Sequence, residues 1–153
     1  MNVPERGLFS NVGRENRFIN NLLINCGYSI SIPKSAGANA IGGSWYNIKK
    51  YPITEEPLKS LYPHLATIEE EVNDVNEYTQ TKYCVIKNNA MFQSGNSDFG
   101  NVAELGGTVE NNVHFDGVPK GDLNTLLDLD YEQIREQIPD FQDIPVEKMG
   151  IYN

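Results

Sequence analysis

The sequence predicts an all-β solenoid, in which short parallel strands stack coil upon coil, with an α-helical excursion and a C-terminal cap. Three features favour this fold class. Adjacent asparagines precede a short apolar segment three times, in "INNLLI", "KNNAMF" and "ENNVHF". Apolar residues flank each pair at the same positions, and the spacing of the pairs fits whole coils. Repetition of this kind is typical of one structural unit stacked on itself.

The apolar residues around each asparagine pair occupy equivalent positions. One lies two residues before the pair, and two more lie two and four residues after its first asparagine. These nine residues are Phe18, Leu22, Ile24, Ile86, Ala90, Phe92, Val109, Val113 and Phe115. Residues two apart share one face of a strand. We therefore expect the alternating residues after each pair to fill the interior of the solenoid.

The spacing of the pairs fits a solenoid that turns at the asparagines. Asn88 and Asn111 are 23 residues apart, which is one coil. Asn20 and Asn88 are 68 residues apart, which fits three coils or one coil with a large excursion. Asparagine tolerates the left-handed backbone of a sharp bend, and stacked amides can bond to one another. The pairs are therefore expected to form a corner, with stacked residues roughly 4.8 Å apart.

The strand pattern stops between residues 33 and 81. "PKSAGANAIGGS" is rich in turn residues, and Pro52, Pro57 and Pro63 interrupt the segment that follows. Apolar residues in this segment have helical spacing, so short helices broken by the prolines are expected. We interpret residues 44–76 as a helical excursion that packs against the strands. One coil with an insertion is therefore favoured over three coils.

The C-terminal region predicts a cap. Asp130 is expected to cap a short helix, with Gln133 reaching back to complete a capping box, and the helix should end before Pro139. Residues 122–153 would then protect the last strand edges. No comparable cap is expected at the N-terminus, so an open edge is expected there. Residues 1–153 are interpreted as a single domain, the C-terminal part of a longer solenoid.

Composition excludes several classes of partner. The chain has 12 basic and 21 acidic side chains and a net charge of −9, whereas nucleic-acid binding needs clustered cations. Its apolar stretches are too short to span a bilayer, and it opens with no signal peptide.

Cys26 and Cys84 are expected to be buried thiols, with a mutual disulfide as the alternative. Neither a metal nor a cofactor is expected, because no zinc, P-loop or dinucleotide motif is present.

Four segments carry a family resemblance. They are "VGRENRFINNLLINCGYSISI", the excursion from Trp45 to the "YPHL" motif, "VIKNNAMF" and "IPVEKMGIY", in this order. Together they resemble the C-terminal region of right-handed parallel β-helix repeat proteins in the pectate-lyase-like superfamily. The nearest likeness is to glycoside hydrolase family 141-like proteins, and it covers nearly all of the chain.

The resemblance implies a carbohydrate-active protein that acts on plant cell-wall polysaccharide, with fucosidase and xylanase activities among those of the group. It also implies an extracellular or periplasmic location. This sequence departs from the family at Pro33, where relatives commonly carry an acidic residue. Enzymatic activity is therefore left open. The alternatives are a non-catalytic glycan-binding or structural chain, and a module that associates with another chain through its open N-terminal edge.

Glycoside hydrolysis generally needs two carboxyl groups that flank the scissile bond. The catalytic candidates are Asp98, in the turn-rich "SGNSDFGN", and Asp116, directly after a strand. Glu104 and Asp74 could also face a groove. For each of them the alternative is a loop carboxylate that accepts hydrogen bonds from nearby backbone. A calcium site that uses Asp98 and Asn96 is a less favoured alternative.

Aromatic residues in the excursion are the candidates for substrate binding. Trp45 and Tyr46 come first, followed by Tyr51 and Tyr62, because aromatic faces can stack on sugar rings. The alternative is that these rings attach the excursion to the strands, with their polar tips hydrogen-bonded. His114 is expected at an outward strand position, as a surface residue rather than a base.

Overall fold

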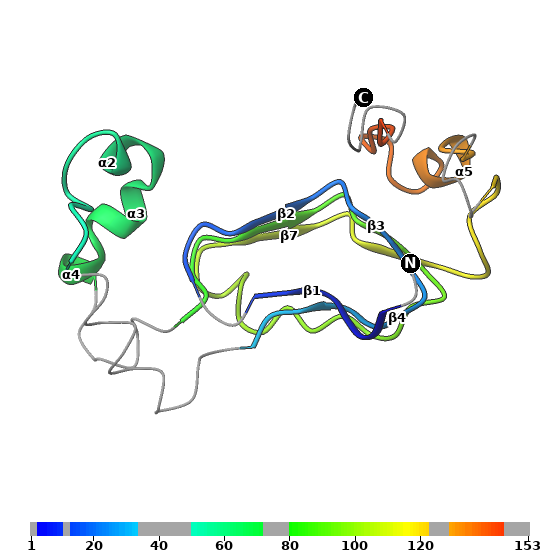
Figure 1. Cartoon of the computed structure of the whole chain (residues 1–153), viewed down its shortest axis with the longest axis horizontal. Coiled ribbons are helices and arrows are strands. Elements are labelled where there is room, and N and C mark those ends of the chain that lie inside the picture. The colour runs from blue at the N-terminus through cyan, green and yellow to red at the C-terminus, as the bar shows by residue number, and fades with distance from the viewer. Residues whose placement is uncertain (1–2, 11–12, 34–49, 72–79, 123–128, 146–153) are drawn as a thin grey trace, which may run out of the picture.

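The computed structural model describes residues 3–10, 13–33, 50–71, 80–122 and 129–145. These residues form a mostly β structure with short helices only (Figure 1). The strands are β1 (Val3–Phe9), β2 (Arg17–Ile19), β3 (Leu22–Ile24), β4 (Cys26–Ser31), β5 (Val85–Lys87), β6 (Ala90–Phe92), β7 (Thr108–Glu110) and β8 (Val113–Phe115). The helices are α2 (Leu58–Leu61), α3 (Pro63–Ala66), α4 (Ile68–Glu71) and α5 (Glu132–Arg135).

The strands form three parallel sheets. Sheet A pairs β1 with β4, sheet B has the order β2-β5-β7, and sheet C has the order β3-β6-β8. Because β2 pairs directly with β5, the long segment between them is an excursion within one pass of the chain. The preference for one coil with an insertion over three coils is thus confirmed. Figure 1 shows the stacked strands of sheet B above those of sheet A, with sheet C joining them at one side.

The pairing register aligns the residues that the repeat identified. Each apolar position of one segment lies opposite its equivalent in the next segment. The three stacked columns are Phe18–Ile86–Val109, Leu22–Ala90–Val113 and Ile24–Phe92–Phe115. The sequence repeat is therefore a structural repeat.

The first asparagine of each pair turns the chain from sheet B into sheet C. Asn20, Asn88 and Asn111 have φ values of 58°, 54° and 50°. These values lie in the left-handed region, which asparagine visits more readily than most residues. The expected corner is confirmed, and its backbone conformation explains why asparagine recurs there.

The second asparagine of each pair forms a hydrogen-bonded ladder. The Asn21 side-chain amide donates to Asn89 Oδ1 at 2.8 Å, and Asn89 Nδ2 donates to Asn112 Oδ1 at 2.6 Å. The same amides tie neighbouring backbones together, since Asn89 donates to the Phe18 carbonyl and Asn112 to the Ile86 carbonyl. Asn89 is fully buried. The ladder thus supplies the partners that buried polar groups require.

The interior between the three sheets is apolar, but its composition corrects the sequence interpretation. A cluster drawn from all three sheets contains Leu23, Cys26, Ile30, Ile32, Cys84, Ile86, Met91 and Val102. The residues that follow the corner asparagine by three, Leu23 and Met91, belong to this interior. Those that follow it by two and four do not. Of the nine repeated apolar residues, only Phe18, Ile86 and Val109 pack in this interior.

The other repeated residues face outward and are covered by the C-terminal segment. Ile24, Ala90, Phe92 and Phe115 form a second cluster, to which α5 and the following residues contribute Ile134, Ile138 and Phe141. The rings of Phe92 and Phe115 stack with centroids 4.7 Å apart. Figure 1 shows α5 and the chain after it outside sheet C. Residues 130–144 therefore cover the outer face of sheet C.

One local expectation differs from the structure. The capping box at α5 does not form, because the Gln133 side chain accepts a hydrogen bond from the Lys120 backbone N–H instead of reaching back. Asp130 does accept a bond from the Glu132 N–H at 3.1 Å.

Candidate functional site

The outer face of sheet B carries two cavities. Arg17 and Val85 are paired in register and line the first cavity, of about 440 Å³. Ile19 and Lys87 are the next outward pair along the same strands and line the second cavity, of about 520 Å³. Outward residues two apart in a strand are separated by roughly 7 Å. The two cavities are therefore neighbours on one face.

The first cavity lies between sheet B and the helical excursion. Its lining residues are Glu15, Arg17, Leu61, Tyr62, His64, Tyr83, Val85 and Gly106. The His64 ring stacks on Tyr83 with centroids 3.8 Å apart and an interplanar angle of 17°. Arg14 Nη1 donates to the His64 carbonyl at 3.3 Å. These contacts hold α3 against the start of the strands and fix one wall of the cavity.

Charged groups complete the first cavity. Glu15 has φ 59°, and its backbone N–H donates to the Lys82 carbonyl at 3.0 Å. Its Oε2 atom is buried and receives no hydrogen bond from the residues that the structure describes. Buried polar atoms without a partner are rare in native proteins. The cavity thus combines the Glu15 carboxylate, the Arg17 guanidinium and the rings of Tyr62 and Tyr83.

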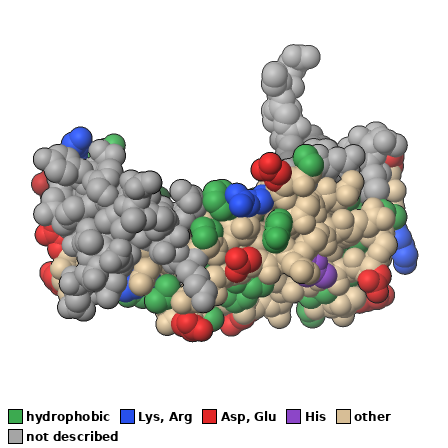
Figure 2. Space-filling view, turned by 90° about the horizontal axis from the view of Figure 1, so that it is seen from below, with side chains coloured by type: hydrophobic (Ala, Val, Ile, Leu, Met, Phe, Trp, Pro, Cys, Tyr) green, Lys and Arg blue, Asp and Glu red, His purple; other side chains and the backbone are tan. Residues whose placement is uncertain are grey.

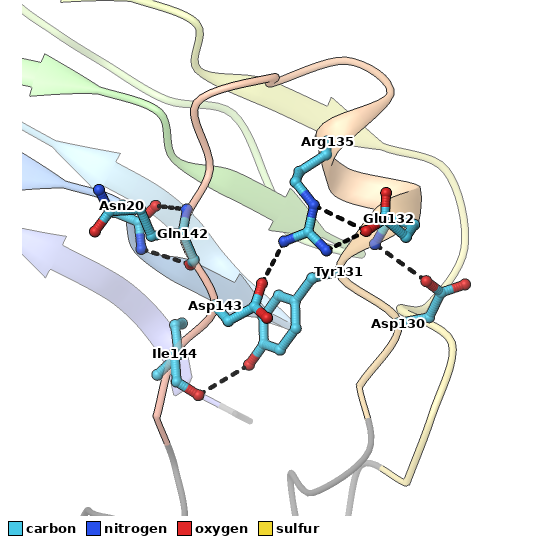
Figure 3. Close-up of polar contacts among 8 residues, drawn as sticks. All are labelled: Asn20, Asp130, Tyr131, Glu132, Arg135, Gln142, Asp143 and Ile144. Carbon is cyan, nitrogen blue, oxygen red and sulfur yellow. Dashed lines mark hydrogen bonds and ion pairs between the residues drawn. The ribbon is translucent and has the colours of Figure 1, made fainter.

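The second cavity lies between sheet B and the C-terminal segment. Its lining residues are Ile19, Asn20, Lys87, Asn88, Pro139, Asp140, Phe141 and Gln142. Figure 3 shows the Asn20 side chain bonded to the Gln142 backbone in both directions. Asn20 Nδ2 donates to the Gln142 carbonyl at 2.9 Å, and the Gln142 N–H donates to Asn20 Oδ1 at 2.6 Å. This corner asparagine therefore holds one wall of the cavity.

A small polar network fixes the C-terminal segment (Figure 3). Arg135 binds the carboxylates of Glu132 and Asp143. These hydrogen bonds, to Glu132 first and to Asp143 second, raise the pKa of the Arg135 guanidinium. The Tyr131 hydroxyl donates to the Ile144 carbonyl at 3.3 Å. The network joins α5 to the chain that follows it.

The two catalytic candidates lie at opposite ends of sheet A. Asp98 pairs with Ser31, the last residue of β4. Asp116 directly follows Phe115, which is stacked in one column with Ile24. Because Ile24 comes just before the start of β4, Asp116 lies near that end of sheet A. A strand of six residues spans roughly 15–20 Å, which exceeds the separation of a hydrolytic carboxyl pair. Asp98 Oδ1 accepts a bond from the Gly100 N–H at 2.9 Å.

The remaining site candidates are distributed differently. Glu104 is exposed in the turn before β7, and Tyr62 lines the first cavity. Trp45, Tyr46 and Asp74 lie outside the described residues. The helices α2, α3 and α4 lie within the expected excursion. Of the two aromatic candidates that the structure describes there, Tyr51 and Tyr62, Tyr62 lines a cavity.

His114 is in register with Met91, which belongs to the interior cluster. Its expected outward position is therefore wrong, for the same reason that the apolar residues around it were misplaced. The expected surface exposure is confirmed nevertheless, because β8 is the last described strand of sheet C and leaves the imidazole exposed. Its Nε2 lies 3.2 Å from Ser97 Oγ.

The sequence interpretation missed Glu15, Arg17 and Tyr83 as site residues. Nothing in "GRENRF" distinguishes a site carboxylate from a surface one. Positive φ at Glu15 is visible only in the structure, and Tyr83 becomes part of the site only by stacking on His64.

The face on the sheet A side has a different character. Figure 2, which views the molecule from below, shows hydrophobic, basic and acidic side chains interspersed there. Tyr28 is 52% exposed, and the Arg6 guanidinium lies 4.4 Å from the centre of the Phe9 ring. The two cavities lie on sheet B instead.

Other chemistry is limited in the part of the chain that the structure describes. No group of three or more His, Cys, Asp and Glu side chains is placed to hold a metal ion there. Within the same ranges, no helix has the length and hydropathy needed to cross a bilayer. Cys26 and Cys84 are buried and not joined by a disulfide, and burial raises the pKa of the Cys84 thiol.

Comparison with known proteins yields no family model, no curated protein and no solved structure that matches this chain.

Proposed function

We propose that this chain forms coils of a right-handed parallel β-helix and binds an oligosaccharide or polysaccharide on the outer face of sheet B. The parallel sheets support the architecture, because strands of successive passes stack in register on three sides of one interior. The resemblance to β-helix proteins that act on polysaccharides supports the class of ligand. In the same proposal the protein is extracellular or periplasmic, like the parent family.

The first cavity is the observation that carries the proposed binding. Tyr62 and Tyr83 supply apolar ring surface with polar tips, and Arg17 supplies fixed hydrogen-bond donors. Glu15 places a carboxylate in the lining, and a carboxylate can accept a hydrogen bond from a sugar hydroxyl. Concave sites that combine apolar surface with a few polar groups are typical of small-ligand binding.

For this chain on its own, we favour sugar binding over sugar hydrolysis. The described lining of the first cavity has one carboxylate, that of Glu15. The usual mechanisms need two, one protonated and one ionised. Asp98 and Asp116 do not form that pair, because they lie at opposite ends of sheet A. Hydrolysis, which the resemblance implies, would require a second acid close to Glu15.

The test is calorimetric titration of the chain with xylo-oligosaccharides and fucosylated oligosaccharides. We expect Tyr62→Ala to weaken binding by about five- to thirtyfold, because ring contacts of this size are worth roughly 1–2 kcal/mol. Tyr28→Ala is the matched control, since Tyr28 is similarly exposed but lies in sheet A. It should leave the affinity unchanged.

Two results would count against the proposal. One is the absence of binding to every oligosaccharide of the panel. The other is an equal loss of affinity in Tyr62→Ala and Tyr28→Ala, which would place the ligand elsewhere. An assay of reducing-sugar release should show no product, and sustained release would replace binding by hydrolysis.

A further inference from the structure

Among the described strands, both ends of the stack lack a further partner strand. In the part of the chain that the structure describes, no strand pairs with the outer side of β2 and β3 at one end, or of β7 and β8 at the other. Open strand edges carry rows of backbone donors and acceptors that can pair with another chain. The question is which partner would fit both edges.

The register tells which backbone groups face outward at each end. Val85 N–H donates to the Asn16 carbonyl, and Asn20 N–H donates to the Lys87 carbonyl. Neighbouring residues of a strand direct their backbone groups to opposite sides. Hence the N–H and C=O groups of Arg17 and Ile19 face the open edge of β2.

The same alternation applies at the opposite end. Thr108 N–H donates to the Cys84 carbonyl, and Asn88 N–H donates to the Glu110 carbonyl. The groups of Val109 therefore face the open edge of β7. The outer side of β7 therefore presents the same pattern of backbone N–H and C=O groups that the inner side of β2 presents to β5. The two edges are complementary in register.

The asparagine ladder is complementary in the same direction. Inside the stack, each side-chain amide donates to the next Oδ1 in the order Asn21, Asn89, Asn112. Continued by one rung, Asn112 Nδ2 of one chain would donate to Asn21 Oδ1 of another. Asn89 also donates to the Phe18 carbonyl of the preceding coil. By the same rule, Asn21 of the added chain would donate to the Val109 carbonyl.

The ends also fit in outline. At one end, β1 adds a strand to sheet A, and no described strand lies beside it in sheets B and C. At the other end, β7 and β8 add strands to sheets B and C, whereas the last described segment beside β4 is the one that contains Asp98. Each end is thus stepped, and the steps are opposite. Partly buried apolar side chains lie at both ends of the interior, namely Leu8 and Phe18, and Phe99 and Val109.

We infer that a second copy of this chain stacks on the first, β2 and β3 of one copy pairing in parallel with β7 and β8 of the other. The contact is head-to-tail, so every added copy presents the same open edge again. Association is therefore open-ended. The inference is independent of sugar binding, because it concerns strand edges and not the outer face of sheet B.

The experiment measures mass against concentration for the full chain, by sedimentation or light scattering. We expect species at multiples of 17.2 kDa that grow with concentration. Two variants each block one edge. Arg17→Pro removes an outward N–H of β2, and Val109→Pro removes one of β7; proline is tolerated at such edge positions.

The two variants complement each other in a way that only head-to-tail stacking explains. Each alone should be a monomer, because one of its edges is blocked. Mixed in equal amounts, they should form a one-to-one dimer and stop, since Arg17→Pro keeps its β7 edge and Val109→Pro keeps its β2 edge. Circular dichroism is the check that each variant is folded.

Arg17→Ala is the matched control, because it removes the side chain and keeps the N–H. It should associate like the unaltered chain, and a monomeric Arg17→Ala would overturn pairing through the backbone. A strictly monomeric unaltered chain at all concentrations would overturn the inference without any variant. So would a folded Arg17→Pro that associates normally, or a mixture that stays monomeric.

Discussion

At the residue scale, the two members of each asparagine pair have different roles. Asn88 adopts a left-handed backbone and bends the chain. Asn89 is extended into the interior and bonds to its neighbours above and below. Conformational tolerance explains the first residue, and an amide that both donates and accepts explains the second. The two positions thus have different requirements, and asparagine meets both of them.

The first prediction concerns the middle rung of the ladder. Asn89→Ala should lower the free energy of unfolding by about 3 kcal/mol, because it breaks four hydrogen bonds of a fully buried amide. Urea denaturation measures the change. Asn111→Gly is the control, since Asn111 is exposed and glycine keeps the positive φ. Its cost should stay below about 1 kcal/mol, and equal losses would contradict the distinction.

The corner also explains which residue-level expectations failed. Phe18 packs in the interior, and unbroken alternation would place residues 20, 22 and 24 on that side as well. The left-handed residue at position 20 interrupts the extended backbone, so that Leu23 faces inward and Ile24 outward. The presence of the corner follows from the asparagines. The change of face that it causes follows only from coordinates.

At the element scale, the C-terminal segment stabilises sheet C by covering its outer face. Ile134 and Ile138 of the α5 region and Phe141 pack on the Phe92–Phe115 stack. The sequence indicated a helix that ends before Pro139, and α5 does so. It did not indicate the face that this helix covers, because the residues of that face had been assigned to the interior.

The second prediction tests this packing. Phe141 is 2% exposed, so Phe141→Ala should lower the free energy of unfolding by roughly 3–4 kcal/mol through lost burial and a cavity. It should also speed proteolysis within residues 130–144. Val118→Ala is the control, because Val118 is 46% exposed and should cost little. A Phe141→Ala chain as stable as this control would contradict the covering role.

At the scale of the whole molecule, the stacking of strands could be predicted from the sequence, whereas the first cavity could not. Stacking in register could be predicted from three similar segments, since each strand pairs with its own equivalent. The first cavity could not, because Glu15, Tyr62 and Tyr83 come from three separate parts of the chain. Only the packing of the excursion against sheet B brings them together.

The central claim is that successive passes of the chain pile in parallel, with Phe18, Ile86 and Val109 in one column. Nuclear Overhauser contacts between backbone protons test it most directly. We expect contacts that link Ile86 to Phe18 on one side and to Val109 on the other, in the pattern of parallel strands. Antiparallel contacts, or none between these three residues, would contradict the account.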